Sequence, residues 1–521
     1  MRHLMPLLAA AASVLSTAPA YADLGDQLAK LLPDDGAADD LFGVSVAISG
    51  TTAIVGAWFA DVNGAQSGSS YLFDTTTGKQ IAKLLANDGA ELDLFGISVA
   101  ISGATAIVGA PGDDDNGTDS GSAYLFDTTT GRQIAKLLPK DGATDDVFGV
   151  SVAISGATAI VGAWGDDDNG VNSGSAYLFD TTTGRQIAKL LPNDGAEFDR
   201  FGVSVGISGA TAIVGTRGDD DNGDNSGSAY LFDTTTGRQI AKLLPNDGAA
   251  DDWFGWRLGI SGATAIVGAY QDDDNGDNSG SAYLFDTTSG RQVAKLLPDD
   301  GAAEDYFGRS VAISGATGEE VAIVGARGND DNGDFSGSAY LFDATTGRQI
   351  VKLLANDGAA GDVFGTSVAI SGATAIVGAP EDDDNGTNSG SAYLFDAAGA
   401  SACPWDLDGN GVVNVLDLLE VVHNFGPCDG ECPADFDGDG IVDVSDLLAL
   451  IANLGECPGT GCPWDVNGDG VVDRLDVIAV NDNMGSCKDP DNCPWDVNGD
   501  GVVDGADVSE VASHFGPCPK E

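Results

Sequence analysis

The chain has 521 residues, with 23 lysines and arginines against 81 aspartates and glutamates, which gives a formal net charge of −58. So acidic a chain repels polyanions, which argues against nucleic acid or an anionic membrane as a partner. Hydrophobic residues make up 42% of the sequence, enough to build cores, so we assign the negative charge to loops.

The first residues have the pattern of a secretory signal. Residues 1–22 combine a basic start with an apolar run over residues 4–15 and a small-x-small sequence ending at Ala22. Such a segment is typical of a signal peptide that is removed before Asp23. The apolar run is shorter than the about 20 residues that span a bilayer, and no later segment reaches that length. We therefore expect a secreted or cell-surface protein without a membrane span.

A repeat with a period of 53 residues follows, interrupted once by four extra residues around Glu319 and Glu320. In the unit at residues 95–147, apolar patterns and turns predict strands at residues 95–101, 105–110, 122–127 and 132–138. Four short antiparallel strands per unit, repeated radially, indicate propeller blades. Each unit begins with a Phe-Gly pair, at Phe42, Phe95, Phe148, Phe201, Phe254, Phe307 and Phe364.

The ends of the array predict that the ring is closed. Residues 27–33 match the fourth strand of a unit, whereas the last unit stops after its third strand at Asp396. Pairing the N-terminal strand into the last blade would cover two sheet edges that otherwise favour aggregation. An open solenoid gains nothing from this split, so we predict an all-β, seven-bladed β-propeller at residues 23–399.

Three motifs make the repeat resemble a known family. They are Phe95-Gly96, Gly109-Ala110-Pro111 and the sequence Gly-Ser-Ala-Tyr-Leu-Phe at residues 121–126. They resemble FG-GAP repeats, the units of the integrin α-subunit propeller and its bacterial relatives. Calcium-binding members carry an Asp-rich insert between the first two strands, whereas this chain has only residues 102–105 there. The resemblance therefore does not imply calcium in the blades.

Acidic loops recur in nearly every repeat, as Asp-Asp-Asp-Asn-Gly at residues 113–117 and 166–170. Clustered carboxylates supply the oxygen ligands of hard cations, so these loops are candidate metal cages. Alternatively, the Asn-Gly pair and the aspartates form a solvated turn. The sequence leaves both interpretations open.

The positions where the repeats differ are candidates for ligand specificity. Several repeats have Trp, Tyr or Arg, where others have mainly small residues, beside the Phe-Gly pair or after the second strand. Equivalent positions in a ring share one face, so these residues predict a patch suited to interfaces or to stacking on sugars. The alternative interpretation is that these positions are under little constraint and that their residues differ by random sequence drift. The predicted ligand face consists of Trp58, Trp164, Arg200, Arg217, Trp253, Trp256, Arg257, Tyr270, Tyr306, Arg309 and Arg327.

The composition changes after Asp396, and all eight cysteines lie in the C-terminal segment, residues 400–521. In an exported chain their even number and constant spacing of 25 positions imply disulfides. Local pairing is the simplest connectivity, although others remain open. The pairs are Cys403 and Cys428, Cys432 and Cys457, Cys462 and Cys487, and Cys493 and Cys518.

Each cysteine pair encloses the spacing of an EF-hand calcium loop. Oxygen-bearing side chains occupy positions 1, 3, 5, 9 and 12, Gly occupies position 6, and position 7 offers a backbone carbonyl. Four occurrences in register make calcium the expected metal. The expected ligands are Asp406, Asp408, Asn410, Val412, Asn414 and Asp417; Asp435, Asp437, Asp439, Ile441, Asp443 and Asp446; Asp465, Asn467, Asp469, Val471, Asp473 and Asp476; and Asp496, Asn498, Asp500, Val502, Asp504 and Asp507.

Each loop runs into an apolar periodic segment, and no helix precedes it. This arrangement resembles the dockerin type I repeat, over residues 403–518. The resemblance implies calcium binding and makes a cohesin-like scaffold a candidate partner. Dockerins usually have two such repeats, whereas this chain has four, and the positions that select a cohesin differ among them. The first segment predicts one helix face with Val415, Leu418, Leu419, Val422 and Phe425.

No catalytic motif stands out. The repeats contain no His and no Cys, which excludes Ser-His-Asp and Cys-His sites there. A carboxylate pair for glycoside cleavage stays open, but nearly all carboxylates recur from repeat to repeat. We expect a secreted, non-catalytic, calcium-binding protein for adhesion or for binding an extracellular protein or polysaccharide. The alternatives are a polysaccharide-degrading enzyme or cellulosome-type component recruited through the tail, and a purely structural envelope protein.

Overall fold

The computed structural model describes residues 24–315 and 320–397, together with isolated positions between residues 412 and 517. Residues 22–399 form one compact unit, and residues 400–521 belong to a second one. The expected signal peptide lies outside the described residues. Among the residues that the structure describes, we find no helix long and apolar enough to span a membrane.

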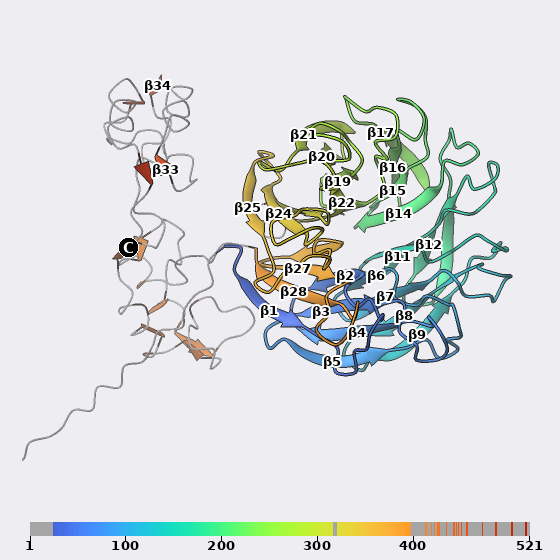
Figure 1. Ribbon diagram of the computed structural model, residues 1–521, viewed down its shortest axis with the longest axis horizontal. Coiled ribbons are helices and arrows are strands. Elements are labelled where there is room, and N and C mark those ends of the chain that lie inside the picture. The colour runs from blue at the N-terminus through green and yellow to red at the C-terminus, as the bar shows by residue number, and fades with distance from the viewer. Residues whose placement is uncertain are drawn as a thin grey trace, which may run out of the picture. The chain divides into compact units, whose positions relative to one another are not determined.

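The first unit consists of seven four-stranded antiparallel sheets, which are the blades of a β-propeller (Figure 1). The strands of blades one to four are β2 (Ser45–Ser49), β3 (Thr52–Ala57), β4 (Ser69–Asp74) and β5 (Lys79–Leu84); β6 (Val99–Ser102), β7 (Thr105–Ala110), β8 (Ser122–Asp127) and β9 (Arg132–Leu137); β10 (Ser151–Ser155), β11 (Thr158–Ala163), β12 (Ser175–Asp180) and β13 (Arg185–Leu190); and β14 (Phe201–Ser208), β15 (Thr211–Thr216), β16 (Ser228–Asp233) and β17 (Arg238–Leu243).

Blades five to seven repeat this order, except that the fourth strand of blade seven is β1. Their strands are β18 (Leu258–Ser261), β19 (Thr264–Ala269), β20 (Ser281–Asp286) and β21 (Arg291–Leu296); β22 (Phe307–Ser314), β23 (Val321–Ala326), β24 (Ser338–Asp343) and β25 (Gln349–Leu353); and β26 (Ser367–Ser371), β27 (Thr374–Ala379), β28 (Ser391–Asp396) and β1 (Gln27–Leu31).

The N-terminal strand closes the ring, as the sequence predicts. β1 pairs antiparallel with β28, which places Lys30 opposite Tyr393, and the two strands lie side by side in Figure 1. The first strands of neighbouring blades pack against one another, including β2 of blade one against β26 of blade seven. The prediction of a closed, seven-bladed propeller is therefore confirmed.

The first strand of most blades is shorter than the alternating pattern predicts. In blade two the strand begins at Val99 rather than at Phe95. Gly96 has a φ of +99°, a conformation that glycine adopts without strain and that interrupts the ladder. Phe95 instead forms a parallel bridge with Gly68 of blade one. The Phe-Gly pair thus joins adjacent blades instead of extending one strand.

Hydrophobic cores lie between consecutive blades, which is why the repeat needs its neighbours. In one of them, Phe148 of blade three packs edge to face against Tyr177 and Phe179, with ring centroids 5.5 and 5.8 Å away. Leu125 and Leu137 of blade two complete the same core. The core between blades seven and one contains Leu31 of β1, so ring closure also buries apolar surface.

Short strands in the C-terminal unit join its repeats in two pairs. β29 (Val412–Val413) pairs with β32 (Gly455–Glu456), and β30 (Gly426–Pro427) pairs with β31 (Ile441–Val442). The third and fourth repeats are joined in the same way, β33 (Val471–Val472) with β36 (Gly516–Pro517) and β34 (Gly485–Ser486) with β35 (Val502–Val503). Positions seven and eight of each predicted calcium loop form the strand that meets the partner repeat.

The helix face expected after the first loop differs from the observed one. Positions 418, 421 and 422 are helical, as predicted. However, Val421 is fully buried, whereas Val422 and Phe425 are 47% and 43% exposed. Apolar residues occupy two adjacent faces of this segment, so periodicity alone did not determine which face packs inward.

Candidate ligand-binding site

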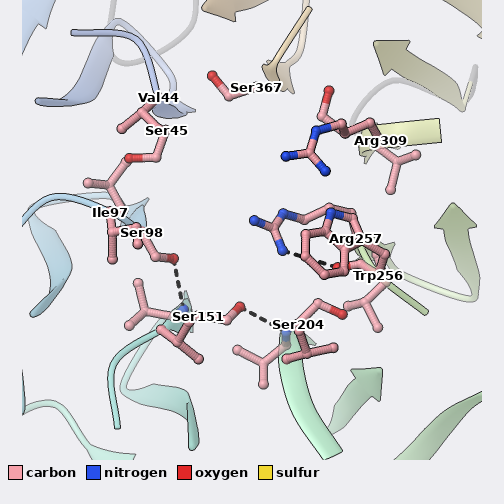
Figure 2. A pocket seen from close by; sticks show the side chains of 18 of the residues that line it. Val44, Ser45, Ile97, Ser98, Ser151, Ser204, Trp256, Arg257, Arg309 and Ser367 are labelled. Atoms are coloured by element: carbon pink, nitrogen blue, oxygen red, sulfur yellow. Dashed lines mark hydrogen bonds between the residues drawn. The ribbon is translucent and has the colours of Figure 1, made fainter. Parts of the chain in front are cut away.

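A cavity of about 520 Å³ lies where the first strands of the seven blades converge. Every blade contributes the three residues that follow its Phe-Gly pair, so the cavity is surrounded by the whole ring. Trp58, Trp164 and Arg217, each from the position after a second strand, add to its wall. Figure 2 shows Trp256, Arg257 and Arg309 on one side of this cavity and Val44, Ser45, Ile97 and Ser98 on the opposite side.

Among the three residues that follow each Phe-Gly pair, the middle one is a serine in six blades and Arg257 in blade five. The serine hydroxyls join neighbouring blades. Ser45 Oγ donates to the Gly96 carbonyl at 2.7 Å, and Ser98 Oγ accepts from the Val152 N–H at 3.0 Å (Figure 2). Arg257 therefore replaces a structural hydrogen-bonding residue with a long cationic side chain.

The first of the three residues after each Phe-Gly pair also differs between blades five and six and the rest of the ring. It is Val, Ile or Thr in five blades, but Trp256 in blade five and Arg309 in blade six. We define the arginine sector of the cavity as Arg217, Trp256, Arg257 and Arg309. One side of the cavity is thus apolar and hydroxyl-bearing, and the other is cationic and aromatic.

Aromatic rings hold the guanidinium groups of the arginine sector. Trp256 is central, because the guanidinium carbons of Arg217, Arg257 and Arg309 lie 4.6, 5.2 and 5.4 Å from its ring centroid. Arg309 also lies 5.2 Å from the Tyr270 ring. Such cation–π contacts hold each guanidinium group in place through the face of an aromatic ring, without an ion pair to a carboxylate.

The positive charge of the arginine sector has no acidic counterpart among the described residues. No aspartate or glutamate lines the cavity, and every ion pair within the described part of the chain is made by a lysine. Burial, followed by neighbouring arginines, lowers the pKa of Arg217 and of Arg309 to about 10.

Several buried donors near the cavity lack an acceptor among the described residues. These are the Nε atoms of Arg200, Arg217, Arg309 and Arg327 and the Nε1 atoms of Trp58 and Trp256. Unsatisfied buried donors are costly, so they mark places where an acceptor-bearing ligand or water belongs.

The structure brings together the other residues of the predicted ligand face. The ring centroid of Trp253 lies 5.7 Å from those of both Trp256 and Tyr270, and the centroids of Tyr270 and Tyr306 are 6.2 Å apart. Arg327 stacks on Tyr306, and Arg200 stacks separately on Trp164; each guanidinium carbon lies 5.8 Å from the ring centroid. Trp58 lines the cavity.

Sequence reasoning missed some participants in this face. Phe59 stacks on Trp58 with centroids 4.2 Å apart, and Phe335 lies 6.5 Å from Tyr306. Both are aromatic residues at positions where the other repeats carry small or polar ones, which is the signal that would have found them. The cavity serines were overlooked because they recur in six blades.

A lysine ammonium group occupies the acidic loops that were candidate metal cages. Lys136 Nζ lies 2.8 Å from Asp113, 2.7 Å from Asp115 and 2.9 Å from Asp88, a residue of the preceding blade connection. Burial by itself lowers the pKa of Lys136, but the hydrogen bonds that it donates to these carboxylates outweigh burial and raise the pKa. The lysine thus supplies the positive charge that the first interpretation assigned to a metal, and the described residues contain no cluster of metal ligands.

Most of the predicted calcium ligands in the tail lie outside the described residues, as do the eight cysteines. The structure describes the backbone at Val412, Ile441, Val471 and Val502, which lie in the paired short strands. It also describes Asp446, at position 12 of the second loop, which is fully buried.

The first unit is thus a repeat-built propeller with one asymmetric cavity, and the second unit is a small module that is also built from repeats. FG-GAP repeats match residues 26–73, 79–126, 132–179, 185–232, 238–285, 291–342 and 348–395. The chain therefore belongs to the FG-GAP repeat family. A dockerin type I domain matches residues 463–516. No curated protein matches the chain.

Proposed function

We propose that this protein is a secreted, non-catalytic binding protein that recognises a ligand at the propeller cavity and is attached through its dockerin-like tail. The observation that carries the proposal is the arginine sector, where three cations stack on one indole inside a cavity whose other lining residues are uncharged. Rigid aromatic and arginine side chains are the residues that contribute most to binding.

The carboxylates with perturbed pKa values support a non-catalytic role. Burial raises the pKa of Asp93, Asp146, Asp199 and Asp252 to about 6. These residues occupy the same place in successive blades. Each carboxylate accepts a hydrogen bond from the backbone N–H of the residue three positions earlier in the sequence. A group repeated in this way suits structure better than one asymmetric active site.

For the tail, we propose calcium-dependent attachment to a cohesin-like partner. The donors in the four loops are carboxylate, amide and backbone oxygens, the set that calcium prefers. The loops with Asp465 and Asp496 at their first positions lie within the segment that the dockerin domain matches. In dockerins these loops bind calcium, which supports the same role for them here.

The experiment uses the full chain to capture partners from the envelope and culture medium of its host, with calcium and with EGTA. We expect calcium-dependent capture that the double variant Asp465→Ala, Asp496→Ala loses. The control Asp145→Ala removes one exposed propeller carboxylate and should capture normally. Release of reducing ends from soluble polysaccharides would contradict the non-catalytic proposal and favour the enzyme alternative.

A further inference from the structure

The arginine sector is an exception to how this chain handles positive charge. Lys30, Lys136, Lys189, Lys242 and Lys295 each lie within 3.1 Å of three carboxylates. In a chain with 81 acidic residues, three arginines nevertheless meet in one cavity that no carboxylate of the described residues lines. Mutual repulsion makes this arrangement unfavourable until an anion enters.

The wall opposite the arginine sector narrows the chemistry of that anion. Outside the arginine sector, the cavity lining offers valine side chains, serine hydroxyls and the indole rings of Trp58 and Trp164. Indole faces stack on the apolar face of a sugar ring, and hydroxyl groups match its substituents. A volume of about 520 Å³ suits a short oligosaccharide segment and not a folded domain.

We propose that the cavity binds a carboxylated polysaccharide, with a uronate carboxylate held by Arg217, Arg257 and Arg309 and a sugar ring stacked among the tryptophans. Guanidinium groups match carboxylates because their N–H edges form paired, charge-assisted hydrogen bonds. The guanidinium carbons of the three arginines all lie within 5.4 Å of the Trp256 ring centroid, so the positive charges gather around one side chain of the cavity wall. This inference rests on the proposed function and specifies its ligand.

The repeats themselves provide substitutions that suit the fold. Arg257→Ser installs the residue found in the other six blades, and Arg309→Val installs the residue of blades one, three and four. Arg185→Ser removes one exposed positive charge at the start of β13, away from the residues that line the cavity, and serves as the control. Thermal unfolding of each variant checks that the propeller remains intact.

The test titrates the full chain with trimers of galacturonate or of mannuronate at about 0.15 M salt, which screens the negative field of the protein. Tryptophan fluorescence and calorimetry report binding. We expect at least one acidic trimer to bind and its methyl ester to bind at least about tenfold more weakly. The double variant Arg257→Ser, Arg309→Val should lose a similar factor, and Arg185→Ser should not.

Three outcomes would overturn the inference. They are no binding of either acidic trimer, equal binding of acid and ester, and tighter binding of an oligo-glutamate peptide than of the sugars. The last would show that the cavity recognises an acidic protein segment. None of these outcomes removes the calcium-dependent capture by the full chain, so failure here is distinguishable from failure of the proposed function.

Discussion

Replacing Lys189 by methionine tests whether the internal ammonium groups stabilise the propeller. Lys189 Nζ lies 2.9, 2.8 and 2.7 Å from Asp141, Asp166 and Asp168. Asp166 is only 5% exposed, so the substitution leaves a buried carboxylate without its cation. Methionine keeps the apolar stem of the lysine, so packing is largely preserved.

The expected loss follows from burial. Breaking a buried ion pair costs about 3–5 kcal/mol, and the partial exposure of the other two carboxylates places this case near the lower limit. With an unfolding entropy of about 2.1 cal/mol/K per residue, a propeller of roughly 370 residues should lose about 3–4 °C in Tm.

Blade one provides the matched control. There Ala60 and Val62 replace two of the aspartates, and Lys83 pairs only with Asp35, which is 53% exposed. We expect Lys83→Met to cost no more than about 1 kcal/mol. The assay is calorimetry of the full chain in both variants. Equal Tm shifts would refute the reasoning, because they would show that the three-carboxylate arrangement adds nothing.

Three further predictions concern pH, backbone conformation and calcium. Because burial raises the pKa of Asp93, Asp146, Asp199 and Asp252 to about 6, the folded state binds more protons than the unfolded state between about pH 4 and 6, and stability should fall as pH rises through this range; a higher Tm at pH 7 than at pH 5 would contradict this. Gly121→Ala should cost more than about 3 kcal/mol in denaturant unfolding, since a Cβ there would lie 2.0 Å from the Phe148 carbonyl oxygen, whereas Gly103→Ala, with open space, should cost only about 1–2 kcal/mol. EGTA should abolish the circular dichroism contribution of the tail and leave the propeller transition in place; a spectrum unchanged in excess EGTA would refute this.

The propeller could be predicted from the sequence because the strand pattern of one blade recurs seven times. The strand at residues 105–110 is observed as predicted, and the incomplete last unit correctly indicated how the ring closes. The clustering of the residues of the predicted ligand face could be anticipated because a ring places equivalent positions together. The length of the first strands was overestimated, because the alternation of apolar and small residues does not reveal that Gly96 interrupts the strand pairing.

The lysine-filled acidic loops could not be derived from a single repeat. Lys136 belongs to a strand, Asp113 to a loop and Asp88 to the preceding blade connection, so only the folded ring brings them together. One signal was present, because a lysine recurs in the fourth strand of every repeat. The distances within the arginine sector likewise depend on side-chain packing that periodicity does not encode.

The position of β1 also determines the order in which the propeller can be finished. During synthesis β1 emerges before every other strand of the ring, yet its hydrogen-bonding partner β28 is the last to emerge. Blades one to six can assemble from neighbouring segments, whereas blade seven requires the two ends of the repeat array to meet. A chain interrupted anywhere before β28 therefore keeps an unpaired strand at its start. Ring closure thus distinguishes complete chains from incomplete ones during folding.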